Sequence, residues 1–313
     1  MKIKQFFKKA AATVMAAVTV LSLLPTTAFA ATGDVGTISF TRTYDSAGNA
    51  MYYNSSAVIN GYTAGGTGKN KYRMYVDGST AFCSQPGVPL KTGNQLTENS
   101  SETWNALSAS QKKAVGLALL YGYQGNRDGL TGSDDEKWLA TQTLVWEFVT
   151  GCRNSTGSFA QTDTTVYSLH FGSNYPNSGA RAAYDQIVSM LTKHNTVPSF
   201  MNGSTRDLEY KDGQYVLTLT DTNGVLSEYS FSSSDRNVSV SKSGNTLTIS
   251  SANAFSGSVR ITSTRNNIPV VSESAKLIAY GDPNLQDLVT GVENTDGVSA
   301  YLNVETPTGT IGL

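Results

Sequence analysis

The sequence has few of the residues that most catalytic and metal-binding sites use. Its 313 residues include only two cysteines and two histidines, and neither a CxxC nor an HExxH spacing occurs. The common zinc and dithiol sites are therefore not expected, and no metal or other cofactor is predicted. A GxSxG nucleophile elbow and a P-loop are also missing, which removes the usual signatures of serine hydrolases and nucleotide-binding ATPases.

Charged residues and long apolar runs are scarce too. Only 15% of the chain is charged, and the one long apolar stretch, residues 10–24, is too short to be a membrane span. It follows four lysines and precedes Ala28-Phe29-Ala30, so residues 1–30 are predicted to be a secretory signal peptide cleaved after Ala30. Removing those four of the 23 Lys and Arg leaves 19 against 24 acidic residues, a net charge of −5. Nucleic acid and anionic membrane are therefore not expected partners, and no membrane insertion of the mature chain is predicted.

The two cysteines leave two readings open for a secreted chain. The simplest is a disulfide between Cys83 and Cys152, which would make the protein a disulfide-bonded, non-covalent surface binding module. A cysteine hydrolase or acyltransferase with Cys83 as nucleophile and His170 as base is the enzyme alternative. The sequence AFCSQPG around Cys83 matches no cysteine-protease signature.

Local patterns predict an α+β chain with two parts. Residues 34–83 are predicted to be strands, with partial alternation in VGTISFTRTY, and Asp77-Gly78 predicts a type I′ hairpin turn. Residues 105–195 are mostly helical, with capping boxes at Ser108 and at Ser133. From about residue 206 short alternating runs predict an all-β immunoglobulin-like sandwich, with VSAYLNVET near the end as its last strand. The predicted domains are therefore residues 31–205 and a spacer domain of residues 206–313.

One residue of the predicted helix EKWLATQTLVWEFVTG, residues 136–151, does not fit its surroundings. At about 100° per residue, Glu136 and Glu147 fall on a polar stripe, whereas Gln142 shares the apolar face with Trp138 and Trp146. Burying an amide without partners costs about 1–3 kcal/mol. Either its oxygen and nitrogen find backbone partners, or a cysteine thiolate has displaced its nitrogen as ammonia. The resulting thioester has no N–H to satisfy, and the two tryptophans would shield it from water.

Two sequence blocks resemble the thioester domains of surface adhesins of Gram-positive bacteria. One is AFCSQ, in which the aromatic Phe82 precedes Cys83. The other is ATQTLVWEFVTG, which is similar to a TQxx-hydrophobic-Trp block and contains Thr141, Gln142 and Trp146. Leu144 departs from the usual small residue two positions after the glutamine. LLYGYQGN and HNTVPSF add a looser similarity, and the resemblance covers about residues 35–200.

The resemblance implies a function as well as a fold. It implies a domain of β-strands with a helical subdomain and a Cys83–Gln142 thioester cross-link, with Phe82, Trp138, Thr141 and Trp146 adjacent to it or shielding it. Such a protein attaches covalently to amines of host surface or matrix proteins and acts once, so it is not an enzyme. The resemblance also implies location at the cell surface or cell wall and further C-terminal stalk domains in a longer protein. Cys152 matches no functional position of the family.

Overall fold

A computed structural model describes residues 33–172, 178–266, 268–269, 276–292 and 298–307. The predicted signal peptide lies outside these residues. Within them the chain forms two compact units. The first unit contains residues 33–196 and the described part of residues 266–297, and the second contains residues 197–265 and 298–307. The predicted α+β class is confirmed, because the first unit combines strands with helices and the second is built from strands with one short 3-10 helix. None of the helices in the described part of the chain is long and apolar enough to cross a membrane.

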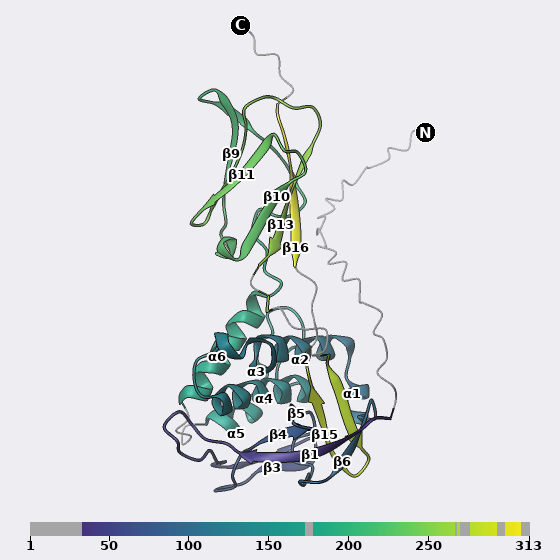
Figure 1. Ribbon diagram of the computed structural model, residues 1–313. Coiled ribbons are helices and arrows are strands. Elements are labelled where there is room, and N and C mark those ends of the chain that lie inside the picture. The colour runs from purple at the N-terminus through teal and green to yellow at the C-terminus, as the bar shows by residue number, and fades with distance from the viewer. Residues whose placement is uncertain (1–32, 173–177, 267, 270–275, 293–297, 308–313) are drawn as a thin grey trace, which may run out of the picture. The chain divides into compact units, whose positions relative to one another are not determined.

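A closed, antiparallel barrel forms one side of the first unit (Figure 1). Its strand order is β1-β4-β5-β15-β14-β6, and β6 pairs with β1 to close it. A small hairpin of β2 and β3 accompanies the barrel. The bounds are β1 Val35–Arg42, β2 Ser56–Ile59, β3 Tyr62–Gly65, β4 Tyr72–Val76, β5 Ser79–Cys83, β6 Gln95–Glu98, β14 Ile278–Asp282 and β15 Leu285–Thr290.

The helices of the first unit gather on one side of the barrel strands in Figure 1. Their bounds are α1 Glu102–Ala106, α2 Ala109–Tyr121, α3 Tyr123–Asn126, the 3-10 helix η1 Arg127–Gly129, α4 Asp134–Thr150, α5 Thr165–Phe171 and α6 Ser178–Lys193. Both predicted capping boxes are present, at Ser108 and at Ser133. Gly151 ends α4 in the left-handed conformation, with φ 76°, which a residue without a Cβ adopts at no steric cost.

Helix α4 lies in the middle of this helical layer. It packs against α2, α3, α5, α6 and β5, and every residue from Trp138 to Val149 is buried. The stripe that looks polar in sequence is therefore not a solvent face. Glu147 is fully buried and pairs with Arg153 at 2.6 Å, while Glu136 caps its own helix start and accepts a hydrogen bond from Ser46.

The second unit is a β-sandwich of two four-stranded sheets. The orders are β10-β13-β16-β7 and β11-β12-β9-β8, and β7 runs parallel to β16. Side chains such as Leu247, Ile249, Ile261 and Leu302 from both sheets share one core. The bounds are β7 Thr205–Asp207, β8 Glu209–Lys211, β9 Gln214–Thr220, the 3-10 helix η2 Leu226–Glu228, β10 Tyr229–Ser233, β11 Val238–Ser243, β12 Thr246–Ser251, β13 Val259–Arg265 and β16 Ser299–Glu305. Its immunoglobulin-like class stays a prediction.

The domain boundary drawn from the sequence differs from the structure. Residues 206–313 were expected to form one contiguous sandwich, but β14 and β15 belong to the barrel of the first unit. The physical reason is pairing: β15 hydrogen-bonds to β5 and β14 to β6, so this hairpin completes the barrel. The chain therefore passes between the units three times, near residues 196, 265 and 297.

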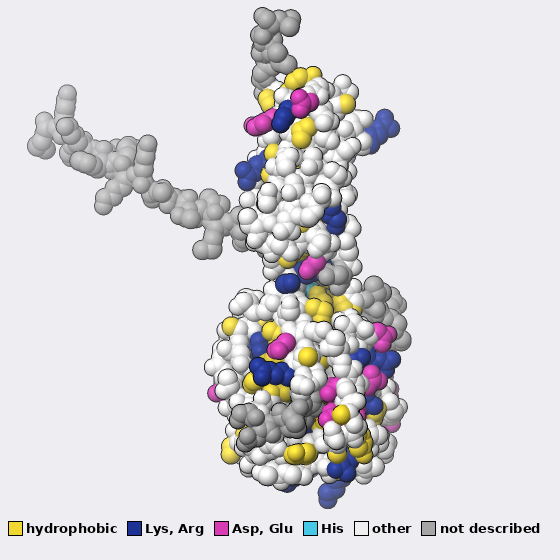
Figure 2. All heavy atoms as spheres, turned by 90° about the vertical axis from the view of Figure 1, so that its left-hand side faces the viewer, with side chains coloured by type: hydrophobic (Ala, Val, Ile, Leu, Met, Phe, Trp, Pro, Cys, Tyr) yellow, Lys and Arg dark blue, Asp and Glu magenta, His cyan; other side chains and the backbone are white. Residues whose placement is uncertain are grey.

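Charged side chains are spread thinly over the face shown in Figure 2. On the face shown in Figure 2, basic and acidic groups are interspersed among neutral ones rather than collected into a field of one sign. This pattern follows from a sequence that is only 15% charged and nearly balanced.

Candidate functional site

Cys83 is positioned by a short and well-defined hairpin. The Asp77-Gly78 turn has φ values of 47° and 79°, as a type I′ turn requires, and it joins β4 to β5. Cys83 is the last residue of β5, and its side chain is completely buried. On one side its strand pairs with β15, where Cys83 is opposite Leu288.

Gln142 of α4 is bound directly to the backbone of Cys83. The Cys83 N–H donates to Gln142 Oε1 at 2.7 Å, and Gln142 Nε2 donates to the Cys83 carbonyl at 2.9 Å. The carboxamide is 2% exposed. Both of its polar groups therefore have backbone partners, and the residue that supplies both partners is the cysteine. The sequence-predicted pair is brought together.

The reason for this contact is a gap in the strand pairing. Strand β4 pairs with β5 only from Val76↔Ser79 to Met74↔Ala81, so the end of β5 has no strand on that side. Side chains of α4 take the place of the absent strand. Gln142 satisfies the backbone of Cys83, and the Trp138 indole N–H donates to the Ala81 carbonyl at 3.1 Å. A buried backbone group left unpaired would be costly, which explains a carboxamide among tryptophans.

Phe82 and Trp138 form one aromatic layer near the pair. Both are buried, and their rings stack with centroids 6.1 Å apart and planes 19° apart. The Trp138 ring is held in place at one end by its hydrogen bond to Ala81. These two sequence-predicted neighbours therefore cover the end of β5 with apolar surface.

Trp146 is also buried, at 4% exposure, and its side chain lies near the sulfur of Cys83. Burial raises the pKa of the Cys83 thiol from 9.0 to about 12. The indole N–H of Trp146 and the Gln85 backbone N–H, which donates to Sγ at 3.3 Å, oppose that rise because they stabilise a thiolate. The nearby carboxylate of Asp287 adds to the rise.

Asp287 and Gln85 are neighbours of the site that the sequence did not reveal. Asp287 lies on β15, is 3% exposed, and accepts hydrogen bonds from the Ser101 hydroxyl at 2.8 Å and the Thr103 N–H at 3.1 Å. Its own backbone holds the cysteine segment, because its carbonyl accepts from Ser84 N–H at 3.0 Å and its N–H donates to Gln85 Oε1 at 3.3 Å. No sequence motif marks these two residues, because Asp287 comes to lie beside Gln85 and Cys83 only when β15, about 200 residues further along the chain, pairs with β5.

Thr141, the residue before the glutamine, has a structural position rather than one at the sulfur. Its hydroxyl accepts from the Tyr123 N–H at 2.8 Å and donates to the Lys137 carbonyl at 2.9 Å. This contact ties the start of α3 to α4. It also requires a glycine at 122, because a Cβ there would lie 2.4 Å from the Thr141 oxygen.

Across the residues that it describes, the structure contains neither a Cys83–Cys152 disulfide nor a hydrogen-bonded Cys83–His170 pair. Cys83 and Cys152 are both free. Cys152 lies two residues beyond the end of α4, past the left-handed Gly151. Among the described residues no hydrogen bond joins Cys83 to His170. The His170 ring instead packs on Trp146 and Tyr53, with centroids 5.0 and 5.6 Å away, and neither of its nitrogens has a hydrogen-bond partner in the described part of the chain.

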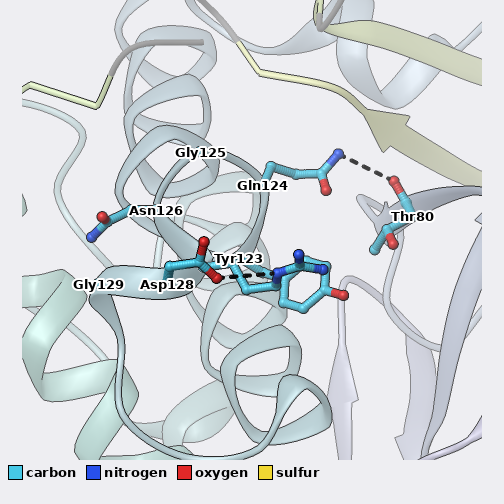
Figure 3. A pocket seen from close by; sticks show the side chains of 8 residues that line it. Thr80, Tyr123, Gln124, Gly125, Asn126, Asp128 and Gly129 are labelled. Atoms are coloured by element: carbon cyan, nitrogen blue, oxygen red, sulfur yellow. Dashed lines mark hydrogen bonds and ion pairs between the residues drawn. The ribbon is translucent and has the colours of Figure 1, made fainter.

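A polar pocket of about 450 Å³ opens near the start of β5. In Figure 3 the side-chain amide of Gln124 points toward Thr80, to whose carbonyl it donates at 3.4 Å. Its lining consists of Thr80, Tyr123, Gln124, Gly125, Asn126, Arg127, Asp128 and Gly129. Neither Cys83 nor Gln142 lines it, so it is not the cysteine–glutamine site. No cluster of three or more His, Cys, Asp or Glu that could hold a metal occurs among the described residues.

Comparison with known proteins identifies the family of this region. Residues 80–193 match the family model of the thioester domain. The resemblance seen in the sequence is thereby confirmed for this segment, which contains both Cys83 and Gln142, and the chain carries a thioester-domain region. Strands β14 and β15 lie outside the match, although they complete the barrel around Cys83.

A search of solved structures and one of curated proteins complete the comparison. The solved thioester domain of the Staphylococcus aureus TIE protein is similar at 20% sequence identity and a TM-score of 0.49, covering 88% of this chain and 99% of that one. No curated protein matches.

Proposed function

We propose that Cys83 and Gln142 form an internal thioester. The sulfur of Cys83 attacks the side-chain carbonyl carbon of Gln142, the bond from that carbon to Nε2 breaks, and the nitrogen leaves as ammonia with the thiol proton. The observation that carries the proposal is the pair of hydrogen bonds, 2.7 and 2.9 Å long, that hold the carboxamide against the cysteine backbone. Such fixed placement converts an encounter of two side chains into a unimolecular step.

The same geometry supplies the donor that the reaction needs. When sulfur adds to the carbonyl carbon, negative charge develops on Gln142 Oε1. The Cys83 N–H already donates to that oxygen at 2.7 Å, in a site from which water is excluded. A fixed donor aimed at the developing charge stabilises the tetrahedral adduct. It would serve equally when an amine later attacks the thioester at the same carbon.

Burial suits a bond that is made once and kept. Cys83 and Gln142 are 0% and 2% exposed, and aromatic rings surround them, so hydrolysis by bulk water is disfavoured. A thiol whose pKa is raised to about 12 is also a poor nucleophile for turnover at neutral pH, because the thiolate is the reactive form. These features support a slow cross-link rather than a cysteine hydrolase.

The biological role follows from the chemistry of a thioester. The family match supports a thioester-bearing, adhesin-like protein and a covalent binder rather than a turnover catalyst. We propose that a primary amine, such as a lysine of a host surface or matrix protein, attacks the Gln142 carbonyl carbon and releases Cys83. The product is an amide that stays in place, so each molecule reacts once. We further propose that the chain acts at the cell surface or cell wall of a Gram-positive bacterium, after its leader is removed near Ala30, and that stalk domains follow.

Amine labelling of the full mature chain tests this function. Incubation with biotinylated cadaverine, without any transglutaminase, is expected to attach one label per chain. Tandem mass spectrometry should place the label on Gln142 and find Cys83 as a newly alkylatable thiol. Cys83→Ala and Gln142→Ala should abolish labelling, whereas the matched control Cys152→Ala should label like the parent. A label that survives Cys83→Ala, or none in the parent, would contradict the proposal.

A further inference from the structure

The indole N–H of Trp146 is buried and has no hydrogen-bond partner among the described residues. This differs from the other tryptophan of the same helix, because the Trp138 N–H donates to the Ala81 carbonyl at 3.1 Å. Native structures seldom leave a buried donor unpaired, so an unpaired indole N–H at this position needs an explanation. One explanation is a hydrogen-bond acceptor that exists only at one stage of a reaction.

The position of Trp146 indicates that partner. It follows Gln142 by four residues on α4, so the two side chains lie one above the other on the same face of the helix. Gln142 contacts the backbone of Cys83, and the Trp146 side chain lies beside that residue's sulfur. The uncharged thiol is a weak acceptor, which leaves the indole N–H unpaired, whereas a thiolate is a strong one.

We propose that the Trp146 indole N–H donates a hydrogen bond to the Cys83 sulfur whenever that sulfur carries negative charge. This inference rests on the proposed thioester. As the bond forms, the donor stabilises the attacking thiolate. As an amine opens it, the bond from the Gln142 carbonyl carbon to nitrogen forms, the bond to sulfur breaks, and the donor stabilises the departing thiolate. The proton lost by the amine ends on the sulfur, and the indole keeps its own.

Two other groups, Gln85 and Asp287, influence the charge of this sulfur, and His170 lies against the Trp146 ring. The Gln85 backbone N–H donates to it at 3.3 Å, and the Asp287 carboxylate opposes a thiolate. His170 packs on the Trp146 ring with centroids 5.0 Å apart, and its pKa is held well below 6.5 by burial, with the charge of Lys71 adding to that effect. An uncharged His170 therefore gives the thiolate no ion-pair partner, and Trp146 is the side-chain donor that faces it.

A pH profile separates this role from simple shielding. In a Gln142→Ala background no thioester can form, so the alkylation rate of Cys83 by iodoacetamide, located by peptide mapping, reports its thiolate. Adding Trp146→Phe keeps a large aromatic ring but removes the donor. Alkylation below the pKa should slow by about three- to tenfold, with the profile moved to higher pH. The matched control Trp138→Phe loses an N–H that serves Ala81 and should leave the profile midpoint in place.

The remaining measurements guard against misfolding and against confusion with the thioester itself. Replacing Trp146 by β-(3-benzothienyl)alanine keeps the shape of the indole without its N–H, and should shift the profile as Trp146→Phe does. In the Gln142-containing chain, both replacements should slow opening by methylamine by a similar factor. Equal profiles for the Trp146 and Trp138 variants would overturn the inference. Because these profiles need no thioester, they test the donor even if the mass of the parent chain disproves the cross-link.

Discussion

Replacing Gln142 by leucine, in a Cys83→Ala background that cannot form a thioester, tests whether the carboxamide supports the fold. The variant leaves the N–H and C=O of residue 83 buried without partners. Each orphaned group costs about 1–3 kcal/mol, so the loss is about 2–6 kcal/mol. Leucine regains about 1–2 kcal/mol through apolar burial. The free energy of unfolding should therefore fall by about 0–5 kcal/mol, with a central value of about 2–3 kcal/mol.

Urea unfolding followed by tryptophan fluorescence suits this measurement. All three tryptophans, Trp104, Trp138 and Trp146, lie in the first unit, so the signal reports that unit alone. The midpoint should fall with an unchanged m-value. Gln186→Leu is the matched control, because its partner, the exposed Thr131, can rebind water. Equal stability of the Gln142→Leu variant and its parent, or an equal loss in the control, would refute the reasoning.

Three further outcomes are expected. Burial holds the pKa of His170 well below 6.5 in the folded chain, so the unfolded chain binds one more proton at low pH and the free energy of unfolding falls as the pH drops below about 6.5. Urea titrations at several pH values should show that His170→Phe removes this contribution to the pH dependence of stability. An unchanged pH dependence in the variant would contradict the prediction. Arg153→Met removes the ion-pair partner of the buried Glu147 carboxylate and leaves it with the hydrogen bonds from Tyr184 and Gln161, so urea unfolding should show a loss of about 3–5 kcal/mol, part of which Glu147→Gln should restore. Because the site is buried, mass spectrometry should show methylamine opening the thioester faster than a bulky lysine peptide; equal rates would indicate an exposed bond.

Local signals in the sequence predicted the local structure. The Asp77-Gly78 turn and the capping boxes at Ser108 and Ser133 occur as expected. Each depends on residues a few positions apart, so the chain encodes it without reference to distant segments. The last strand, predicted in VSAYLNVET, forms for the same reason.

The assignment of strands to domains was not predictable in this way. Strands β14 and β15 are buried along almost their whole length, unlike the alternating sandwich strands β12 and β13, and they complete the barrel of the first unit. Alternation shows that a segment is a strand but not which strand it pairs with, because pairing is decided by long-range contacts. For this reason the sequence did not indicate that Asp287 of β15 lies next to the cysteine segment.

The site was predictable in part. Periodicity placed Gln142 on the apolar face of its helix, and only the family resemblance selected Cys83 as its partner. The structure adds what neither could supply: β4 stops short of Cys83, so the glutamine takes the place of a strand. The polar stripe wrongly indicated a solvent-exposed face, because α4 is buried on all sides and the charge of Glu147 is paired with Arg153.

The intact mass of the folded, unreduced mature chain tests the central claim most directly. A Cys83–Gln142 thioester predicts a mass lower than that of the sequence by one ammonia, with the deficit lost in Cys83→Ala and in Gln142→Ala. A deficit of two hydrogens that a reductant restores would indicate a disulfide instead. An unshifted mass in freshly prepared protein would contradict the thioester.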